Sequence, residues 1–354
     1  MKVAVVGAGL IGRLLTYYLL QENCNVTIFE QGGETGETSA GHVAAGMVAP
    51  YSEYDSHNLE ILNLGLDSIQ QWREIAAHLS AENFYTEAGT LTIAFAQDKN
   101  ELSHRQRCLN KVLPEEIRLL RGRELQAYEQ ELQRNDLQGF FLSGEGHVDG
   151  RKFYKAMTNY FKKQDLQWKT FTQVQEIEPG KVILAEEQYS FDWVFDCRGL
   201  GAKDAFPELR GIRGELIWLQ ADKVNLQRPI RFLHPRYPIY LVPRLGNQYI
   251  LGATTIESEE TSPITVRSTL ELLTAVYSLH PEFSEARMIH TEVGCRPALL
   301  TNRPRIIYQP RLIRINGLYR HGYLYGPSLA REVVNVIHHG LEKIKYNTSW
   351  ETTS

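Results

Sequence analysis

The chain has 354 residues, a length that suggests about two domains. Hydrophobic residues make up 43% and charged residues 23% of the sequence, a balance that excludes disorder as the main state. The formal net charge is −4, from 38 basic and 42 acidic residues, so no basic surplus exists for binding nucleic acid.

The cysteines and the apolar segments bear on the compartment of the protein. The four cysteines are scattered, without a CxxC pair or a histidine at zinc spacing, so we expect neither a disulfide framework nor a metal site. No apolar stretch reaches the roughly 18 residues of a membrane span, and no signal-peptide cleavage site follows the first apolar run. We therefore expect a cytoplasmic protein with reduced thiols and no integral membrane span.

The first 30 residues predict a strand, a helix and a second strand. Residues 2–6 are rich in β-branched side chains, as in strands that are buried on both faces. Residues 10–22 carry apolar side chains at helical spacing, and residues 25–30 form a second strand that ends in Glu30. A GxGxxG motif at residues 7–12 fills the turn between the first strand and the helix.

Each part of this motif has a physical reason. Gly7 permits a tight turn, Gly9 lets the backbone approach a pyrophosphate, and Gly12 allows the helix to pack closely on the strand. The helix N-terminus offers free N–H groups to phosphates, and Glu30 can accept hydrogen bonds from ribose hydroxyls. The unit therefore predicts adenine-dinucleotide binding. It does not separate FAD from NAD, whereas Glu30 argues against the 2′-phosphate of NADP.

The remaining chain predicts a mixture of helices and strands without an evident linker or repeat, so we expect interleaved domains. In chain order we expect a loop over 35–58, a helix over 59–79, strands over 84–95, helical structure over 98–137, a strand over 139–142, a helix over 151–163, two strands over 183–197, long antiparallel strands over 211–255, a helix over 264–280, a strand over 286–293, alternating apolar positions over 305–315 and a helix over 327–343, after Pro327.

A second glycine-containing turn follows the predicted strand at residues 193–197. The strand runs directly into Arg198 and Gly199, where a glycine allows close approach of the backbone. Such a strand end suits the carboxyl edge of a sheet beside a cofactor. An ordinary exit from strand to turn explains the same residues equally well.

Several motifs, in this order along the chain, resemble the D-amino-acid oxidase superfamily of FAD enzymes and, within it, the glycine oxidase family of the thiamine pathway. The matching pieces are GAGLIG with Glu30, TSAGHVAAGMVAP at 38–50, FDCRGLGA at 195–202, RGIRGE at 210–215, YLVPRLGNQYILGATTIES at 240–258, GCRPAL at 294–299 and LYRHGYLYGP at 318–327. Together they cover most of the chain.

The resemblance implies an α/β fold in which a Rossmann-like FAD-binding domain is interleaved with an antiparallel-sheet α+β substrate domain. We expect the FAD-binding domain to comprise residues 1–84, 140–210 and 290–345. The substrate-binding domain would then comprise residues 85–139 and 211–289. Members of the family often form homo-oligomers, and a homo-oligomer is one expectation for this chain.

The resemblance also implies FAD as the cofactor. We expect it to be non-covalent, because His42 is one residue out of step with the position at which some relatives attach flavin. The implied cofactor-binding residues are, for the ADP half, Gly7, Gly9, Leu10, Ile11, Gly12, Glu30 and Gln31; for the adenine, the backbone of Val174; in the loop near the flavin ring, Ser39, His42, Ala45, Gly46 and Met47; at the second glycine turn, Arg198 and Gly199; and at the pyrimidine edge, Arg320, His321, Gly322, Tyr323 and Leu324.

For the substrate, the resemblance implies that Arg296 pairs with a carboxylate and that Tyr240 and Arg320 make further contacts. A guanidinium is a planar, permanently charged fork that matches a carboxylate through two parallel hydrogen bonds. Each residue also has an ordinary explanation: a surface ion pair for Arg296, a core aromatic for Tyr240 and a local salt bridge for Arg320. Thr255 replaces a methionine of some relatives, which leaves the pocket size open.

The resemblance implies the oxidative deamination of glycine or small D-amino acids. A hydride would pass from the substrate Cα to flavin N5, so the cofactor carries the chemistry and we expect no catalytic side chain and no metal. The imine would hydrolyse to a 2-oxo acid and ammonia, and oxygen would reoxidise the flavin and give hydrogen peroxide. A small amino acid and oxygen are thus the expected partners, with no nucleic acid.

Three alternatives stay open at the level of sequence. The first is an FAD-dependent D-amino-acid dehydrogenase that passes electrons to a quinone or another carrier. The second is a flavin-binding protein without turnover, and the third is an NAD-dependent dehydrogenase. The sequence also leaves the preferred amino acid open, because glycine, sarcosine and small D-amino acids all fit the implied contacts.

Overall fold

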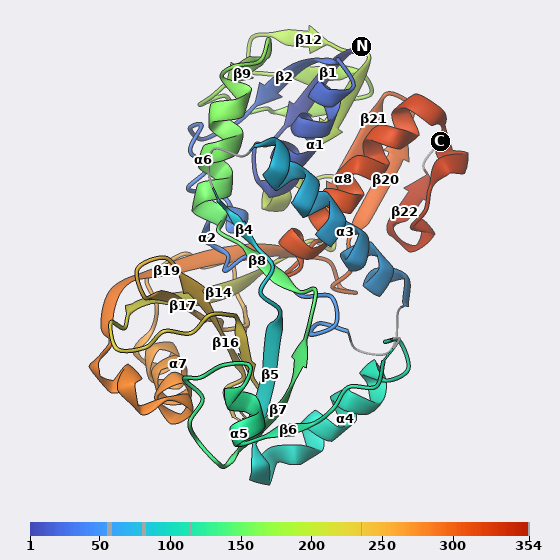
Figure 1. The fold of residues 1–354 in the computed structure, drawn as a ribbon. Helices are drawn as coiled ribbons and strands as arrows, with labels where there is room; N and C mark the ends of the chain where they lie inside the picture. Colours follow the sequence, from blue (N-terminus) through green and yellow to red (C-terminus); the bar gives the residue numbers. More distant parts are fainter. Residues whose placement is uncertain (55–58, 80–82, 114, 235, 353–354) are drawn as a thin grey trace.

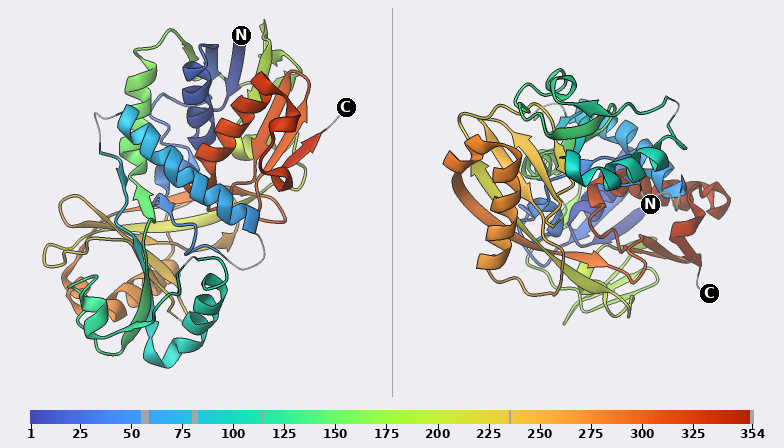
Figure 2. Two further views of the ribbon diagram at one scale, coloured as in Figure 1. Left: turned by 45° about the vertical axis from the view of Figure 1, so that its right-hand side comes forward. Right: turned by 90° about the horizontal axis from the view of Figure 1, so that it is seen from below.

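A computed structural model describes residues 1–54, 59–79, 83–113, 115–234 and 236–352. The chain builds two large sheets, one above the other in Figure 1, and both termini lie in the part that holds the seven-stranded sheet (Figures 1 and 2). Short 3₁₀ helices lie at Ala96–Asp98, Gly199–Ala202, Pro281–Glu285, Leu341–Lys343 and Asn347–Ser349.

The seven-stranded sheet draws its strands from the beginning, the middle and the end of the chain. Around the central β1, the pairings with β2, with β13 and onward to β9 and β21 are parallel, whereas β20 runs antiparallel to β21. Its strands, in spatial order, are β22 (Trp350–Thr352), β20 (Arg305–Gln309), β21 (Leu312–Asn316), β13 (Trp193–Asp196), β1 (Lys2–Val6), β2 (Asn25–Phe29) and β9 (Gln167–Lys169). This parallel core confirms the Rossmann-like prediction.

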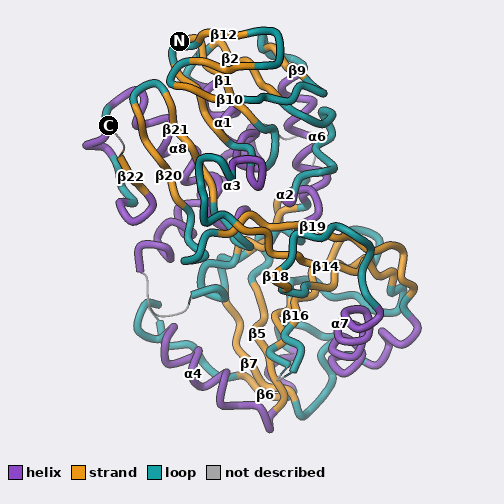
Figure 3. Tube along the Cα trace, turned by 180° about the vertical axis from the view of Figure 1, so that it is seen from behind, coloured by secondary structure: helices purple, strands orange, loops and turns teal. Residues whose placement is uncertain are grey.

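Both faces of this sheet are covered, as the β-branched run at residues 2–6 predicts. Val3 and Val5 face a layer of helices, whereas Ala4 and Val6 face a small meander on the opposite side (Figure 3). The helices are α1 (Leu10–Gln21), α3 (Leu59–His78), α6 (Gly150–Phe161) and α8 (Gly322–His339). The meander comprises β10 (Glu176–Glu178), β11 (Lys181–Ile183) and β12 (Gln188–Ser190).

The nine-stranded sheet is mostly antiparallel and also has two covered faces. Ile217 and Leu219 pack on α7 (Val266–Leu279), whereas Leu216 and Trp218 face residues 43–47 of the other part of the molecule. Its strands are β18 (Ile256–Glu257), β14 (Arg210–Gln220), β17 (Gln248–Gly252), β16 (Ile239–Arg244), β15 (Ile230–Phe232), β5 (Thr90–Phe95), β7 (Leu137–Leu142) and β6 (Leu120–Arg121), with β19 (Arg287–Ala298) paired to β14.

Three expectations need correction. The expected loop over 35–58 contains α2 (Ala40–Val43) and β3 (Met47–Val48), and β3 joins β8 (Gly146–Val148) and β4 (Tyr85–Thr86) in a small sheet; residues 55–58 of that prediction lie outside the described residues. In the expected helical stretch over 98–137, the described residues form the α-helices α4 (Lys99–Leu109) and α5 (Arg123–Gln126), with β6 between them, and residue 114 lies outside the described residues. Most charged residues of this stretch lie on the protein surface and do not belong to one continuous amphipathic helix.

The third correction concerns α8, which begins at Gly322 and thus contains Pro327. Proline has no N–H, so the carbonyl of Tyr323, four residues earlier, lacks its helical donor. The indole Nε1 of Trp72 donates to that carbonyl at 2.7 Å instead. A buried tryptophan from α3 therefore lets the helix begin before Pro327. The sequence prediction differed because proline is common in the first turn of a helix.

The boundaries of the two interleaved domains stay a prediction. β7 runs across the predicted boundary between residues 139 and 140, and β19 runs across the one between residues 289 and 290. Among the described residues, no helix has both the length and the apolar character needed to cross a membrane.

Candidate functional site

The glycine turn after β1 is as tight as its sequence predicts. Gly7 has a φ of +96°, and a Cβ there would lie 2.6 Å from the carbonyl oxygen of Cys197. A Cβ on Gly12 would lie 1.9 Å from the carbonyl oxygen of Gly7. Because backbone occupies both positions, neither residue can carry a side chain, and α1 begins close to the carboxyl ends of β1 and β13.

Two helix N-termini lie side by side at this turn. Gly9 is the N-cap of α1 and His321 that of α8, and neither has a side chain that caps its helix. The two first turns touch, since a Cβ on Gly322 would lie 3.1 Å from Cδ2 of Leu10. Free backbone N–H groups and two aligned helix dipoles make this region favourable for an anion such as a pyrophosphate.

Glu30 is fixed at the end of β2 by two backbone donors. Its Oε2 accepts from the N–H of Ala8 at 2.6 Å and its Oε1 from the N–H of Gly32 at 2.8 Å. The N–H of Thr172 donates to the carbonyl of Glu30, which brings the segment with half-buried Val174 to the same edge. Of the other residues predicted for the ADP half, Gln31 is exposed at this edge, whereas the Ile11 side chain lies in the core.

The second glycine turn touches the first one through its backbone. Gly7 lies against the carbonyl of Cys197 and the Cα of Arg198. The guanidinium of Arg198, in contrast, is held by the buried Asp196 at 2.8 Å and by Asp204 at 3.0 Å. The structure therefore places Arg198 and Gly199 beside the turn but commits the Arg198 side chain to two carboxylates.

The loop predicted to lie near the flavin ring is held by α6 and β16. Ser39 Oγ lies 2.7 Å from the hydroxyl of Tyr154, and the His42 ring meets the same tyrosine edge-on at 5.5 Å. Burial lowers the pKa of His42, so its imidazole is neutral at pH 7. The carbonyl of Ala45 accepts from the Arg244 guanidinium at 2.7 Å. Gly46 and Met47 follow, and Met47 pairs with His147 of β8.

Two of these anchoring residues were missed by sequence reasoning. Arg13 is fully buried, donates to the carbonyl of Ala8 and the hydroxyl of Thr158 at 2.9 Å each, and lies 4.5 Å above the Tyr154 ring. It thereby joins the glycine turn to α6. In the sequence Arg13 only interrupts an apolar run, and Arg244 looks like an ordinary strand residue, so no local signal identified either.

Arg296 projects from β19 across β14. Its guanidinium donates to the carbonyl of Thr254 at 3.1 Å and to that of Arg213 at 3.4 Å. Gly214 makes room for it, since a Cβ there would lie 2.1 Å from a guanidinium nitrogen of Arg296. Among the described residues, no carboxylate lies within salt-bridge distance of Arg296. Its neighbour Arg213, in contrast, is paired with buried Glu215 at 2.7 Å.

The structure brings Tyr240 close to both predicted substrate arginines. Burial raises the pKa of its hydroxyl, while the positive charges of Arg296 and Arg320 and a hydrogen bond with Arg296 act in the opposite direction. The hydroxyl is therefore protonated at neutral pH. Thr255, whose effect on pocket size was left open, is exposed.

Arg320 and His321 are held by Glu53, which sequence reasoning missed. One carboxylate oxygen of Glu53 lies 2.7 Å from Arg320 and 3.1 Å from His321, and the other lies 2.6 Å from Arg231. Burial alone would raise the pKa of Glu53, but the guanidiniums of Arg231 and Arg320 hold it well below its usual range. Burial also lowers the pKa of His321.

The remaining residues predicted at the pyrimidine edge form the first turn of α8. The hydroxyl of Tyr323 donates to the carbonyl of Gly41 at 2.8 Å, and Leu324 packs near Gly65 of α3. Gly322 contacts Leu10 of α1, as described above. This turn therefore ties the flavin-side loop to the glycine turn.

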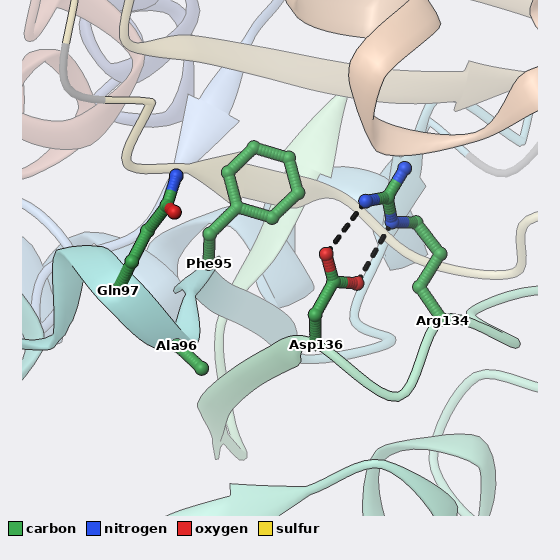
Figure 4. Close-up of a pocket in the computed structure, with 5 residues that line it drawn as sticks. All are labelled: Phe95, Ala96, Gln97, Arg134 and Asp136. Atoms are coloured by element: carbon green, nitrogen blue, oxygen red, sulfur yellow. Dashed lines mark hydrogen bonds and ion pairs between the residues drawn. The ribbon is translucent and has the colours of Figure 1, made fainter.

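Two hollows differ in the charges that line them. A cavity of about 500 Å³ lies beside Glu53 and includes Arg320, His321 and Leu324 in its wall. The second, of about 370 Å³, lies at the far end of the nine-stranded sheet (Figure 4). There Arg134 and Asp136 face each other and form two hydrogen bonds of 2.9 and 2.6 Å, so the second hollow has no free charge to offer a ligand.

The described residues fit an adenine dinucleotide with a flavin ring. The glycine turn admits backbone close to a phosphate, the paired helix N-termini suit its charge, and Glu30 offers carboxylate oxygens beyond them. Residues 43–47, which the resemblance places near the flavin ring, are held in position by packing on Leu216 and Val242. Within the described ranges, no group of three or more potential metal ligands occurs.

Known proteins resemble this chain over most of its length. The family model DAO, FAD dependent oxidoreductase, matches residues 2–336. A putative thiamine biosynthesis oxidoreductase, ThiO, of Rhizobium etli is 35% identical over 94% of this chain and 95% of its own. A glycine oxidase of Geobacillus kaustophilus is 23% identical over 95% of this chain and 92% of its own.

Solved structures show the same fold. A glycine oxidase of Bacillus cereus superposes with a TM-score of 0.85 at 22% identity, over 98% of this chain and 99% of its own. An iminodiacetate oxidase of Chelativorans superposes with a TM-score of 0.84 at 22% identity, over 99% of both chains. The cofactor is accordingly FAD rather than NAD. The chain belongs to the DAO family of FAD-dependent oxidoreductases and is an enzyme.

Proposed function

We propose that this enzyme oxidises glycine or small D-amino acids to imines, with oxygen as the final electron acceptor. The observation that carries the proposal is Arg296, a half-buried guanidinium beside Tyr240 that has no carboxylate partner among the described residues. A partly buried arginine is expected to have an anionic partner, and an amino-acid carboxylate supplies one. The names of the relatives from R. etli and G. kaustophilus support the same reaction class.

The chain's own residues would bind and orient the substrate. Arg296 is held by the carbonyls of Thr254 and Arg213, which fix the plane of its guanidinium and leave its other N–H groups for a carboxylate. The Tyr240 hydroxyl keeps its proton at neutral pH and can donate to the same carboxylate. Arg320 adds positive charge, although Glu53 shares it. These contacts hold the substrate Cα in one orientation.

FAD, when bound, supplies a hydride acceptor and passes the electrons on. In the overall reaction the amino acid loses two electrons and two protons to give an imine, and oxygen gains them to give hydrogen peroxide. Water then converts the imine to a 2-oxo acid and ammonia. An amino acid that binds with a neutral amine needs no side-chain base. Tyr240, which lies beside Arg296, is protonated at neutral pH and therefore acts as a hydrogen-bond donor rather than as a base.

Anaerobic titration of the holoenzyme tests this proposal. Glycine, sarcosine and D-alanine should bleach the oxidised flavin absorbance, whereas L-alanine should not. We expect Arg296→Met to lower kcat/KM by roughly 30- to 5,000-fold, the equivalent of about 2–5 kcal/mol. Arg287→Met is the matched control, since Arg287 is exposed on the same strand. Unchanged bleaching by Arg296→Met, or none with any amino acid in the wild type, would overturn the proposal.

The electron acceptor needs a separate measurement. The D-amino-acid dehydrogenase alternative shares the substrate contacts and differs only in the acceptor. Hydrogen peroxide formed in air, compared with reduction of an artificial dye, separates the two. Peroxide in a 1:1 ratio to imine supports an oxidase, and dye reduction without peroxide supports the dehydrogenase.

A further inference from the structure

The cavity beside Glu53 carries an inference about the substrate. It lies between the loop at residues 50–54, α4, the segment at residues 301–304 and the first turn of α8. We call it the Glu53 cavity. It shares Arg320 with the proposed substrate site, but neither Arg296 nor Tyr240 lines it. Its volume of about 500 Å³ falls within the range of small-molecule sites and exceeds what glycine needs.

The described wall of the Glu53 cavity carries more positive than negative charge. Four arginines line it, whereas Glu53 and Glu101 are its carboxylates. Glu53 pairs with both Arg231 and Arg320, and Glu101 pairs with Arg105 at 2.9 Å. The fourth arginine is Arg303, and among the described residues no carboxylate lies within salt-bridge distance of it. The four are Arg105, Arg231, Arg303 and Arg320.

Part of this excess charge is withdrawn from water. The side chain of Arg231 is 16% exposed and that of Arg105 23% exposed, and both donate to the carbonyl of Ser52. Like charges held close together in a partly buried wall repel each other, and an anion between them removes that cost. In the second hollow, by comparison, Arg134 and Asp136 neutralise each other. The Glu53 cavity is therefore the hollow whose charges suit an acidic group.

Arg320 lies where the two sites meet. On one side it adds positive charge to the surroundings of Tyr240, and on the other it contacts Glu53 in the cavity wall. The charges of Arg320 and Glu53 both act on the Tyr240 hydroxyl, so a substrate branch that points from Tyr240 toward Arg320 would lead to the cavity wall. A second acidic group on that branch would enter the region of excess positive charge.

We propose that the Glu53 cavity is a subsite for a second acidic group of the substrate, so that the enzyme oxidises small amino or imino diacids as well as glycine. The proposal rests on the proposed function, because the first carboxylate is held by Arg296. The oxidation is the same two-electron, two-proton reaction. Recognition of the second acid adds only charge-assisted hydrogen bonds from the cavity arginines.

A pair of N-substituted glycines tests the subsite. Sarcosine carries an N-methyl group and iminodiacetate an N-carboxymethyl group, so they differ chiefly in the second acid. We expect the wild-type holoenzyme to oxidise iminodiacetate with a lower KM than sarcosine, and this advantage should shrink as the salt concentration rises. Oxidation of glycine and sarcosine without any turnover or binding of iminodiacetate would overturn the subsite and leave the proposed function intact.

Arg303→Gln tests whether the positive charge in the cavity wall, rather than the net charge of the protein, favours iminodiacetate. Arg303 is exposed at the cavity wall, and its side chain forms no hydrogen bond or ion pair with the described residues, so its loss should leave the fold unchanged. We expect a rise of about three- to tenfold in the KM for iminodiacetate, with that for sarcosine unchanged. Arg287→Gln, outside the cavity, should change neither. Equal effects of Arg303→Gln on both substrates would contradict the subsite.

Binding provides a readout that does not depend on turnover. Calorimetry should show that iminodiacetate binds the wild-type holoenzyme and binds Arg303→Gln about three- to tenfold more weakly. If no amino acid bleaches the flavin, the proposed function fails, but this difference in affinity still supports an acid-binding subsite. Equal affinity for both proteins would overturn it.

Discussion

The glycine turn and the arginine site are built in opposite ways. The turn takes its shape from missing side chains, because backbone atoms occupy the places where Gly7 and Gly12 would carry a Cβ. The arginine site, made by Tyr240, Arg296 and Arg320, takes its shape from long side chains that distant parts of the chain supply. The first region should therefore fail completely when one methyl group is added at Gly7 or Gly12. The second should respond according to whether the altered side chain has a buried partner.

The largest effect should come from Gly12→Ala. The new Cβ would lie 1.9 Å from the carbonyl oxygen of Gly7, a backbone atom that cannot move aside as the end of a flexible side chain could. We expect a loss of about 5 kcal/mol or more in the free energy of unfolding and almost no FAD in the purified protein. Chemical denaturation and the ratio of flavin to protein absorbance measure the two effects.

Gly9→Ala is the matched control for this substitution. A Cβ on Gly9 would meet nothing closer than the Cβ of Ser39 at 3.7 Å, an ordinary contact, and the φ of Gly9 is −70°. We expect nearly wild-type stability together with weaker FAD binding, because this glycine is predicted to lie against the pyrophosphate. Equal destabilisation by both alanines would refute the distinction between a packing glycine and a ligand glycine.

The next effect separates the two arginines beside Gly214. Arg213→Met leaves Glu215, which is fully buried, without its partner, so we expect a loss of about 3–5 kcal/mol in the free energy of unfolding. Arg296→Met removes hydrogen bonds to two carbonyls and one with the Tyr240 hydroxyl but leaves no buried carboxylate without its partner, and we expect a loss below about 1.5 kcal/mol. Denaturation of both variants is the measurement. A larger loss for Arg296→Met would mean that Arg296 is structural.

The same contrast explains what the sequence could predict. The strand at residues 2–6, the helix that follows and Glu30 lie within 30 residues, and local patterns and a single motif determine their arrangement. Family resemblance pointed to Tyr240, Arg296 and Arg320, and the structure brings these three together. Whether they bind a substrate stays a prediction.

Glu53 could not be found in this way. Its partners Arg231 and Arg320 are 178 and 267 residues away, and Glu53 itself lies in a loop without any periodic pattern. The start of α8 was missed for a similar reason, since Trp72 of another helix compensates for Pro327. Long-range partners of single side chains leave no trace in one sequence, whereas a backbone turn leaves its glycines.

A further expected effect concerns Glu145, which holds the loop that carries Glu53. Both the N–H and the hydroxyl of Ser52 donate to its carboxylate at 2.7 Å. Burial nevertheless raises the pKa of Glu145 from 4.5 to about 7. Between these values the folded protein retains a proton that the unfolded chain has lost. The free energy of unfolding should therefore fall as the pH rises from about 5 to 7, by about 3 kcal/mol in total.

Glu145→Gln removes this titration and keeps the shape of the side chain. The variant should show a flatter dependence of stability on pH, and it should gain stability relative to the wild type above pH 7, where the wild-type carboxylate is buried with its charge. Urea denaturation at pH 5, 6, 7 and 8 measures the slope, with exposed Glu285→Gln as the control that retains it. If the slope survives in Glu145→Gln, the proton belongs to another group. If it disappears, the proton belongs to Glu145, and the loop that carries Glu53 is anchored by an acid whose charge is unfavourable in the folded protein.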